Sequence, residues 1–337
     1  MSNNNANGTF NDTANDMANA ATPINAFVHT LRFETPEITC IELQPVGGGE
    51  FPAFEAGAHI DLHLPNGMLR SYSLLNAPSE RHRYVLGVLK DRASRGGSRC
   101  VHEQLRIGMP LLISAPRNHF QLHEEASHSV LVAGGIGVTP LLSMGRRLQQ
   151  LGRSFEVLFF ARSRRSAAFV REVEALGVPV HWHFDDEAGQ PPDLAALLAA
   201  RAQPGTHYYA CGPAVMLDSF ETTCAALGYA NAHVERFSAV EVAAASDART
   251  TYSVELRRSG KTIQVAADQS LLQALSAAKV AVSTSCEEGI CGSCETRVLE
   301  GIPDHRDSVL SASEKTANKV MMVCVSGCKS ERLVLDL

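Results

Sequence analysis

The chain has 337 residues, 45% of them hydrophobic and 20% charged, and its formal net charge is −6 at pH 7. This composition excludes a chain that is disordered throughout and fits a globular protein of two or three domains. The acidic balance, without a dense Lys/Arg cluster, excludes a typical nucleic-acid-binding protein. With no run of about 18 apolar residues for a membrane span and no secretion signal at the start, we expect a cytoplasmic enzyme with neither nucleic acid nor membrane as partner.

In chain order, a tail is followed by a series of short strands. Residues 1–22 are mostly Asn, Ala, Gly, Ser and Thr, which predicts a disordered tail. Asn66-Gly67 predicts a type I′ hairpin turn. Short β-rich runs occur at 27–33, 38–43, 59–64, 69–75, 83–90 and 111–114. We therefore expect a small closed antiparallel β-barrel over residues 23–125.

The pattern then changes to alternating strands and helices, which predicts an α/β domain with a parallel sheet over residues 126–237. The expected strands are 129–133, 156–160, 178–184 and 207–211, and the expected helices are 140–151, 167–176, 193–202 and 214–227. Residues 238–250 are rich in Ala, Val and Ser and are expected to form a linker.

The last part of the chain, residues 251–337, is expected to form a third domain. Runs at 251–257 and 261–265 flank Ser259-Gly260, which predicts a hairpin. Leucines at 271, 272 and 275 mark one face of a short helix.

Five of the nine cysteines fall within residues 286–328, a distribution typical of metal ligation rather than of a disulfide framework. Cys286, Cys291 and Cys294 are spaced as C-x4-C-x2-C, and Cys324 follows after 29 intervening residues. This is the plant-type ferredoxin spacing for a 2Fe–2S cluster, which is held by four thiolates. The sequence therefore predicts an iron–sulfur centre in the third domain.

Two alternatives stay open at this cysteine cluster. A structural zinc site is one, although such sites favour two C-x2-C pairs and only one is present. Cys328 is the other, as a replacement for Cys324, which has the usual spacing and falls within an expected strand at 320–325. Cys40, Cys100 and Cys224 are scattered and are assigned no ligand role.

The segment from Cys286 to Gly301, followed by His305-Arg306-Asp307, resembles the C-terminal ferredoxin of the phthalate dioxygenase reductase family. The resemblance implies a multidomain fold in a fixed order: an FMN-binding β-barrel like that of ferredoxin reductases, an α/β NAD domain, and an α+β ferredoxin domain of the β-grasp type. It implies FMN, NADH and a 2Fe–2S cluster as cofactors.

For the flavin, Arg70-Ser71-Tyr72-Ser73 is similar to the R-x-Y-S motif of these barrels, in which the Tyr packs on the isoalloxazine ring and the Arg meets the phosphate. Arg95 precedes Gly96, Gly97 and Ser98, and a helix is expected from there to Leu105, so its N-terminus would hold the same phosphate. Taken alone, the first motif also fits an edge strand and the second a solvent turn.

For the nicotinamide, Gly134-Gly135-Ile136-Gly137-Val138-Thr139-Pro140 follows a strand and opens a helix, with Thr139 expected at the N-cap and Pro140 at the first helical position. The segment lacks the third glycine of G-x-G-x-x-G, and no acidic residue ends the next strand, so a Rossmann dehydrogenase is disfavoured. It is similar instead to the GGIG-x-TP motif of flavin reductases.

Two further motifs match these reductases. Cys211-Gly212-Pro213 with Met216 is similar to their C-G-P-x-x-M signature, which implies that Cys211 lies at the hydride-transfer site with Tyr72 and Ser73. Glu235-Arg236-Phe237 resembles their E-x-F ending, in which Phe237 lies near the flavin.

The choice between the two nicotinamide cofactors depends on Arg162, Arg164 and Arg165, which occupy the expected place of the adenosine ribose. These arginines suit a 2′-phosphate, so NADPH stays an alternative, whereas the resemblance favours NADH.

The resemblance implies a path from NADH through flavin and cluster to a terminal Rieske-type oxygenase that acts on an aromatic compound. Alternatives are another acceptor, such as a cytochrome P450, another monooxygenase or ferric iron, or a redox sensor. Glu287 and Glu288 in the cluster loop suit either the docking of a basic partner or plain solvation. A monomer is the simplest expectation for a mobile carrier.

Overall fold

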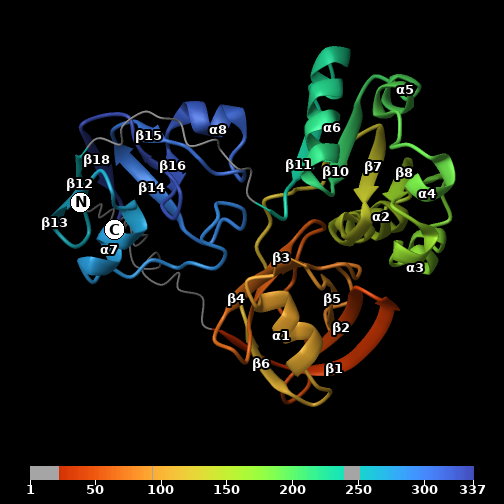
Figure 1. Cartoon of the computed structure of the whole chain (residues 1–337), viewed down its shortest axis with the longest axis horizontal. Helices are drawn as coiled ribbons and strands as arrows, with labels where there is room; N and C mark the ends of the chain where they lie inside the picture. Colours follow the sequence, from red (N-terminus) through yellow and green to blue (C-terminus); the bar gives the residue numbers. More distant parts are fainter. Residues whose placement is uncertain (1–22, 93, 239–250) are drawn as a thin grey trace, which may run out of the picture.

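The computed structural model describes residues 23–92, 94–238 and 251–337, which form three separate main sheets (Figure 1). The predicted tail at 1–22 and all of the predicted linker except Ser238 lie outside these residues. No helix in the described ranges has the length and apolar character needed to cross a bilayer.

The first sheet is antiparallel and has six strands in the order β4-β3-β6-β1-β2-β5. A bridge between Leu74 and Leu86 joins its two end strands and closes the barrel, as predicted. Its strands are β1 (Ile24–Thr35), β2 (Ile38–Pro45), β3 (His59–His63), β4 (Leu69–Ser73), β5 (Tyr84–Leu89) and β6 (Pro110–Ile113), and helix α1 spans Gly97–Gln104.

The hairpin between β3 and β4 forms as predicted, but its turn is not of type I′. Gly67 donates its N–H to the Leu64 carbonyl at 2.9 Å, and within residues 64–68 only Gly67 has a positive φ, of 79°. Pro65 explains the difference: the observed turn is centred on Pro65 and Asn66 rather than on Asn66 and Gly67, and the fixed φ of proline near −65° suits the first central position of such a turn and excludes type I′ there.

The second sheet is parallel, with strand order β11-β10-β7-β8-β9, and confirms the predicted α/β architecture. Its strands are β7 (His128–Gly134), β8 (Phe155–Ala161), β9 (Val180–Phe184), β10 (Thr206–Cys211) and β11 (Ala232–Glu235). Its helices are α2 (Val138–Gln150), α3 (Val170–Glu174), α4 (Asp185–Ala188), α5 (Leu194–Ala199) and α6 (Ala214–Leu227), with 3-10 turns at Gly135–Gly137 and Arg164–Ser166.

Two helix starts differ from the sequence prediction. The 3-10 turn at Gly135–Gly137 runs directly into α2, so Thr139 and Pro140 lie inside its first turn rather than at the N-cap and first positions. The Thr139 hydroxyl donates to the Ile136 carbonyl at 3.1 Å. Helix α3 starts later than predicted because Phe169 takes a left-handed φ of 60° while its ring enters the core.

The third sheet is mixed, with strand order β13-β12-β18-β14-β16, and β12 and β18 run parallel, in keeping with the expected α+β ferredoxin domain. Its strands are β12 (Tyr252–Leu256), β13 (Lys261–Val265), β14 (Glu295–Glu300), β16 (Val320–Met322) and β18 (Arg332–Leu335). A small β15 (Pro303–Asp304) and β17 (Gly327–Cys328) pair apart from it, and the helices are α7 (Leu271–Ala277) and α8 (Ala312–Ala317). Strand β16 ends before Cys324, which the sequence had placed within a strand.

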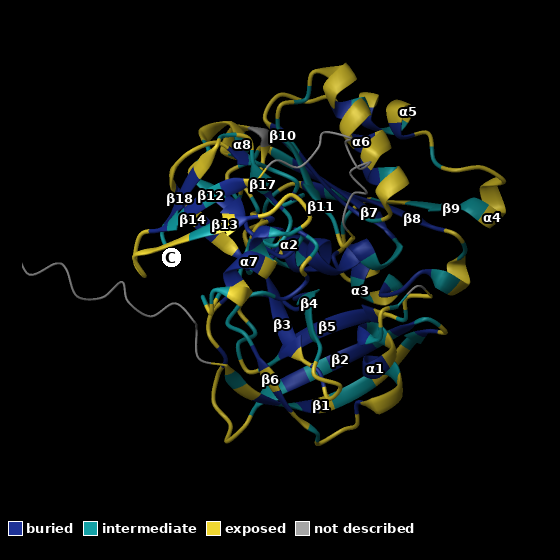
Figure 2. Ribbon diagram, turned by 60° about the vertical axis from the view of Figure 1, so that its left-hand side comes forward, coloured by how far each residue is buried: buried dark blue, intermediate teal, exposed yellow. Residues whose placement is uncertain are grey.

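The barrel and the parallel sheet share one hydrophobic core. Ile38, Val85 and Phe120 of the first part pack in the same cluster as Leu141 and Phe169 of the second. Buried residues fill the strands of both, while exposed residues lie on the outer surfaces of α5 and α6 (Figure 2). Because apolar packing of this kind resists separation, the two parts hold a fixed relation at their contact.

We expect Gly137→Ala to lower the free energy of unfolding by about 1–3 kcal/mol, because an added Cβ would lie 2.1 Å from the backbone carbonyl oxygen of Cys211. The φ of Gly137 is −61°, so the cost comes from a clash rather than backbone strain. Denaturant unfolding followed by circular dichroism measures the change. Gly327→Ala is the control, because its nearest neighbour would be 3.8 Å away; equal stability of the two variants contradicts the close contact.

Candidate active site

A cavity of about 1280 Å³ lies where the barrel, the parallel sheet and the cysteine-rich loop meet. Tyr72 lines it from the barrel, Gly135 and Gly212 from the parallel sheet, and Cys286 and Cys291 from the third domain. One space therefore receives side chains and backbone from all three sheets.

On the barrel side, Arg70 lies against the first turn of α1. A Cβ added at Gly97 would be 2.6 Å from the Arg70 Nε, so glycine leaves room for this side chain. Gly96 takes a φ of 110° as the helix enters at Gly97. A guanidinium and the free N–H groups of a helix N-terminus are both suited to a phosphate, so the residues fit the predicted flavin phosphate.

Strand β4 presents Ser71, Tyr72 and Ser73 to the same cavity. Burial raises the pKa of the Tyr72 phenol, so this ring stays neutral and offers an aromatic face. These properties fit a flat isoalloxazine ring.

On the parallel-sheet side, the lining comes from the carboxyl ends of β7 and β10, where ligands of open α/β sheets bind. Gly135 and Thr139 follow β7, and Gly212 and Pro213 follow β10. An added Cβ at Gly212 would lie 2.9 Å from the Gly134 Cα, so the two turns touch through backbone. This backbone surface fits the close approach of a nucleotide.

Cys211 is fully buried and does not itself line the cavity. It pairs in register with Glu235 on β11, and the Glu235 carboxyl lies 3.5 Å from the Ser73 hydroxyl. Burial raises the pKa of Glu235 to about 8 and the pKa of the Cys211 thiol well above its usual range. Both groups therefore hold their protons at neutral pH, and the sequence had assigned no role to Glu235.

The three predicted arginines do not all face the cavity in the structure. Arg164 pairs with Glu187 at 2.6 Å and lies over the Phe184 ring at 4.5 Å, outside the cavity lining. Arg162 and Arg165 do line the cavity. Fewer guanidinium groups therefore face the nucleotide position than the sequence suggested.

The four predicted cluster ligands form two pairs of free thiols. The Sγ atoms of Cys294 and Cys324 lie 3.1 Å apart, and the side chains of Cys286 and Cys291 hydrogen-bond to each other. The Glu288 N–H donates to the Cys286 Sγ at 3.3 Å. Two thiolates for each of two irons is the arrangement that a 2Fe–2S cluster requires.

The alternative of a single zinc ion fits less well. A single zinc ion requires four thiolates in one tetrahedral set, whereas the sulfur contacts are those of two separate pairs, Cys294 with Cys324 and Cys286 with Cys291. The alternative ligand Cys328 donates to the Ser330 carbonyl at 2.8 Å instead of pairing with Cys294.

A buried ion pair joins the barrel to the cysteine loop. Asp61 of β3 is paired with Arg117 at 2.7 Å, and Arg117 also donates to the Ser293 hydroxyl at 2.9 Å. Ser71 donates to Asp61 at 2.5 Å. Burial raises the pKa of the Asp61 carboxyl, but Arg117 and Ser71 outweigh that effect and hold it below its ordinary value.

A buried histidine makes a second contact to the loop. The Nε2 of His59 lies 3.1 Å from the Cys291 carbonyl, and burial, with a smaller contribution from Arg117, lowers the His59 pKa to about 4. The ring is therefore neutral and donates its N–H to that carbonyl. Gly292 has a φ of 71°, and an added Cβ would lie 2.1 Å from His119. No sequence motif had indicated His59, Asp61, Arg117 or His119, because their partners are distant in the chain.

Glu288 pairs with Arg95 at 2.9 Å, within this chain. Its carboxylate therefore links the cysteine loop to the predicted phosphate loop, and 34% of its side chain stays exposed to solvent.

The predicted site residues divide into those that line the cavity and those that support it. The lining includes Arg70, Ser71, Tyr72, Ser73, Ser98, Gly135, Thr139, Arg162, Gly212, Pro213, Phe237, Cys286 and Cys291. The others, Gly96, Gly97, Gly137, Pro140, Cys211, Cys294 and Cys324, lie outside the lining.

Comparisons with known proteins agree with this architecture. Residues 254–329 match the family described as the 2Fe-2S iron-sulfur cluster binding domain. Phenoxybenzoate dioxygenase subunit beta of Ectopseudomonas oleovorans is 47% identical over 95% of this chain and 100% of its own length.

Two solved structures are similar over 94% of this chain. Phthalate dioxygenase reductase is 37% identical with a TM-score of 0.68, and 98% of its chain is covered. An intact type IV self-sufficient cytochrome P450 monooxygenase is 39% identical with a TM-score of 0.87, and 41% of its chain is covered. The order of flavin, nicotinamide and iron–sulfur parts is thus that of oxidoreductases of known structure.

We expect Glu235→Gln to change how stability depends on pH. The carboxyl binds a proton in the folded chain between its ordinary pKa of 4.5 and about 8, whereas the unfolded chain has released it. The free energy of unfolding of the wild type therefore falls by about 1.4 kcal/mol for each pH unit as pH rises through this window. The variant, which has no carboxyl group at this position, does not show this decrease.

The single tryptophan, Trp182 on β9, reports this unfolding by fluorescence in urea at pH 5 to 8. Glu174→Gln, at an exposed glutamate of the same domain, serves as control. Parallel pH curves for wild type and Glu235→Gln would show that Glu235 is ionised at neutral pH.

Proposed function

The chain belongs to the phthalate dioxygenase reductase family, and from that premise we propose that it is the NADH-dependent reductase component of a Rieske-type aromatic-ring oxygenase. In this proposal residues 23–125 bind FMN, residues 126–237 bind NADH and residues 251–337 bind a 2Fe–2S cluster. Electrons pass from NADH to FMN, to the cluster and then to the terminal oxygenase, whose substrate is a phthalate-type or similar aromatic carboxylate.

The single observation that carries the proposal is the shared cavity. Tyr72, Gly135 and Cys291 line one space although they belong to three different sheets. When bound, a flavin accepts a two-electron hydride and a 2Fe–2S cluster carries single electrons, so the pair converts one kind of transfer into the other. Electron transfer requires short distances between the cofactors, and three ligand sites that open into one cavity provide them.

For FMN, we propose that Arg70, Gly96, Gly97 and Ser98 hold the phosphate, and that Ser71, Tyr72, Ser73 and Phe237 surround the ring. Arg70 supplies a fixed positive charge beside the α1 N-terminus, and Gly97 keeps that position open to the side chain. The Tyr72 ring excludes water from the face that it covers.

For NADH, we propose that the turn containing Gly135, Gly137, Thr139 and Pro140 holds the pyrophosphate, with Arg162 near the ribose. Cys211, Gly212 and Pro213 shape the nicotinamide position. The proton on Glu235 keeps a negative charge away from the reacting rings, and Ser73 orients that carboxyl. Arg164 pairs with Glu187 rather than facing the position of a 2′-phosphate, which supports NADH over NADPH.

Cys286, Cys291, Cys294 and Cys324 are the proposed iron ligands. We propose that the partner interaction is transient and that the chain acts as a cytoplasmic monomer. The nine free thiols support a reducing compartment.

A second candidate function is a reductase for a cytochrome P450, since the structure with the TM-score of 0.87 is that of a P450 monooxygenase. Reconstitution of the purified chain with a Rieske oxygenase and, separately, with a P450 discriminates between the two acceptors. Product formation with the P450 alone would replace the main proposal by this one.

The proposal predicts that the purified protein contains about one FMN and two irons per chain, and that anaerobic NADH bleaches both the flavin and cluster bands. Visible spectra with iron, sulfide, zinc and flavin analysis test this, with NADPH compared in parallel. Cys324→Ser should lose the cluster, whereas the matched variant Cys328→Ser should keep it. A colourless zinc protein, or equal effects of the two variants, contradicts the ligand set.

We expect Arg117→Leu to slow electron transfer from flavin to cluster at least about tenfold while leaving flavin reduction by NADH unchanged. The variant loses the hydrogen bond from Arg117 to Ser293 of the cysteine loop and leaves the buried Asp61 with hydroxyl partners but no counter-charge, at a cost of about 3 kcal/mol. Stopped-flow absorbance resolves the two phases.

Arg153→Leu is the matched control, because Arg153 pairs with the highly exposed Glu125. Equal slowing of both phases in Arg117→Leu would mean that Arg117 supports the whole fold rather than the position of the loop.

A further inference from the structure

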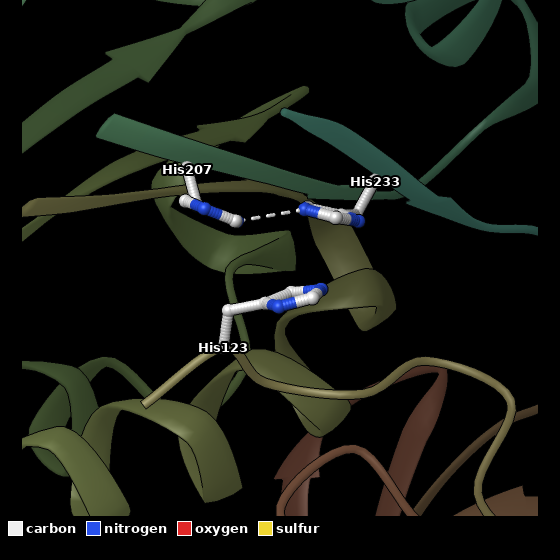
Figure 3. A group of neighbouring side chains, drawn as sticks. All are labelled: His123, His207 and His233. Atoms are coloured by element: carbon white, nitrogen blue, oxygen red, sulfur yellow. Dashed lines mark hydrogen bonds between the residues drawn. The ribbon is translucent and has the colours of Figure 1, made fainter. Parts of the chain in front are cut away.

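Three histidines meet at the amino ends of β10 and β11, away from the cavity. His207 lies on β10, His233 on β11, and His123 on the connection that leads from the barrel into β7. Figure 3 shows the His123 ring facing the other two imidazoles. None of the three lines the active-site cavity.

The register of the two strands places His207 and His233 together. Tyr209 pairs with His233, and His207 lies two residues before Tyr209, so all three share one face of the sheet. The buried Tyr209 also fixes the third member, because its hydroxyl accepts the His123 backbone N–H at 2.9 Å. The pairing of β10 with β11 and the hydrogen bond that holds the His123 backbone thus bring the three side chains together.

The geometry of the nitrogens suits a shared ligand. The Nδ1 of His207 and the Nε2 of His233 are 3.0 Å apart, and one nitrogen from each of the three rings lies within 4.8 Å of the others. Two imidazole nitrogens bound to one tetrahedral ion at about 2.0–2.1 Å lie about 3.3 Å apart. His207 and His233 form a nearly parallel hydrogen-bonded pair, and the ring of the exposed His123 packs on both, so binding of one ion requires the rings to rotate until three nitrogens point at it.

The surroundings of His207 and His233 also favour the neutral form of these two rings, which is the form that binds metals. Burial lowers the pKa of His233 to about 4, with smaller contributions from His123 and His207, and burial likewise lowers the pKa of His207.

We propose that His123, His207 and His233 form a binding site for a divalent transition-metal ion such as Zn²⁺, with a fourth position open to solvent. Imidazole ligands suit zinc, copper and nickel rather than magnesium or calcium. Bound metal would link the connection between barrel and parallel sheet to the edge strand β11 and its neighbour β10. Cys211 lies four residues further along β10, about 13 Å away, so this site is separate from the proposed redox centre.

The proposal is tested with the full-length holoprotein, titrated with Zn²⁺ in competition with a chromophoric chelator. Iron and flavin are quantified in the same samples, so that zinc entering an emptied cysteine site is recognised. We expect one zinc per chain beyond the cluster, and we expect His123→Ala and His207→Ala each to weaken binding at least about tenfold. His63→Ala, at an exposed histidine of the barrel, should bind as wild type does.

His123 is exposed, so its variant is the one least expected to disturb folding. Flavin reduction by NADH should be unchanged in His123→Ala, which separates this site from the proposed function. Electron paramagnetic resonance of the oxidised holoprotein with one equivalent of Cu²⁺ should show nitrogen couplings that are lost in His123→Ala. Zinc affinity equal in wild type, His123→Ala and His63→Ala would overturn the proposal and leave a hydrogen-bonded imidazole group only.

Discussion

The buried carboxylate of Asp61 has to be balanced where the barrel meets the cysteine loop. Arg117 supplies the balancing charge and also donates a hydrogen bond to Ser293 of that loop. The same guanidinium that neutralises Asp61 therefore positions the cysteine loop of the third domain. His59 adds a directional contact through the Cys291 carbonyl. Because a buried charge without a partner is costly, this arrangement favours one docking position over many. The cavity described above depends on that position, since four of its lining residues, Cys286, Glu288, Ile290 and Cys291, belong to the loop.

The barrel and the parallel sheet are joined by a different kind of contact. Their shared apolar core fixes the relation of β4 to the turns after β7 and β10, and it is supplemented by an ion pair between Arg32 and Glu172 and by a hydrogen bond from Arg146 to the Leu75 carbonyl at 2.6 Å. Glu235 lies where these elements come together, and burial there keeps it protonated. The molecule thus combines a largely apolar contact between the barrel and the parallel sheet with a largely polar contact between the barrel and the cysteine loop.

Local features of the sequence predicted most of the architecture and many of the lining residues. The cysteine spacing, the glycine turn before α2 and the R-x-Y-S strand are each contained in a few residues, so their chemistry is readable without the fold. The prediction of a type I′ turn was wrong because the turn is centred on Pro65 and Asn66, where the fixed φ of proline excludes that type. The prediction of Thr139 as N-cap was wrong because a 3-10 turn precedes α2 and the helix begins before Thr139. His59, Asp61 and Arg117 were missed because their partners are set by packing between domains. The histidine group was missed for the same reason: strand register brings its members together, and no spacing marks it.

The unequal burial of the four cysteines gives the iron–sulfur loop an inner and an outer side. Cys286 and Cys291 face the cavity, while Cys324 is the one member of the set that is only partly covered. In the proposed electron path, Cys286 and Cys291 would hold the cluster on the side of the flavin cavity, and Cys324 would hold it on the side nearer to solvent, where a partner protein could approach.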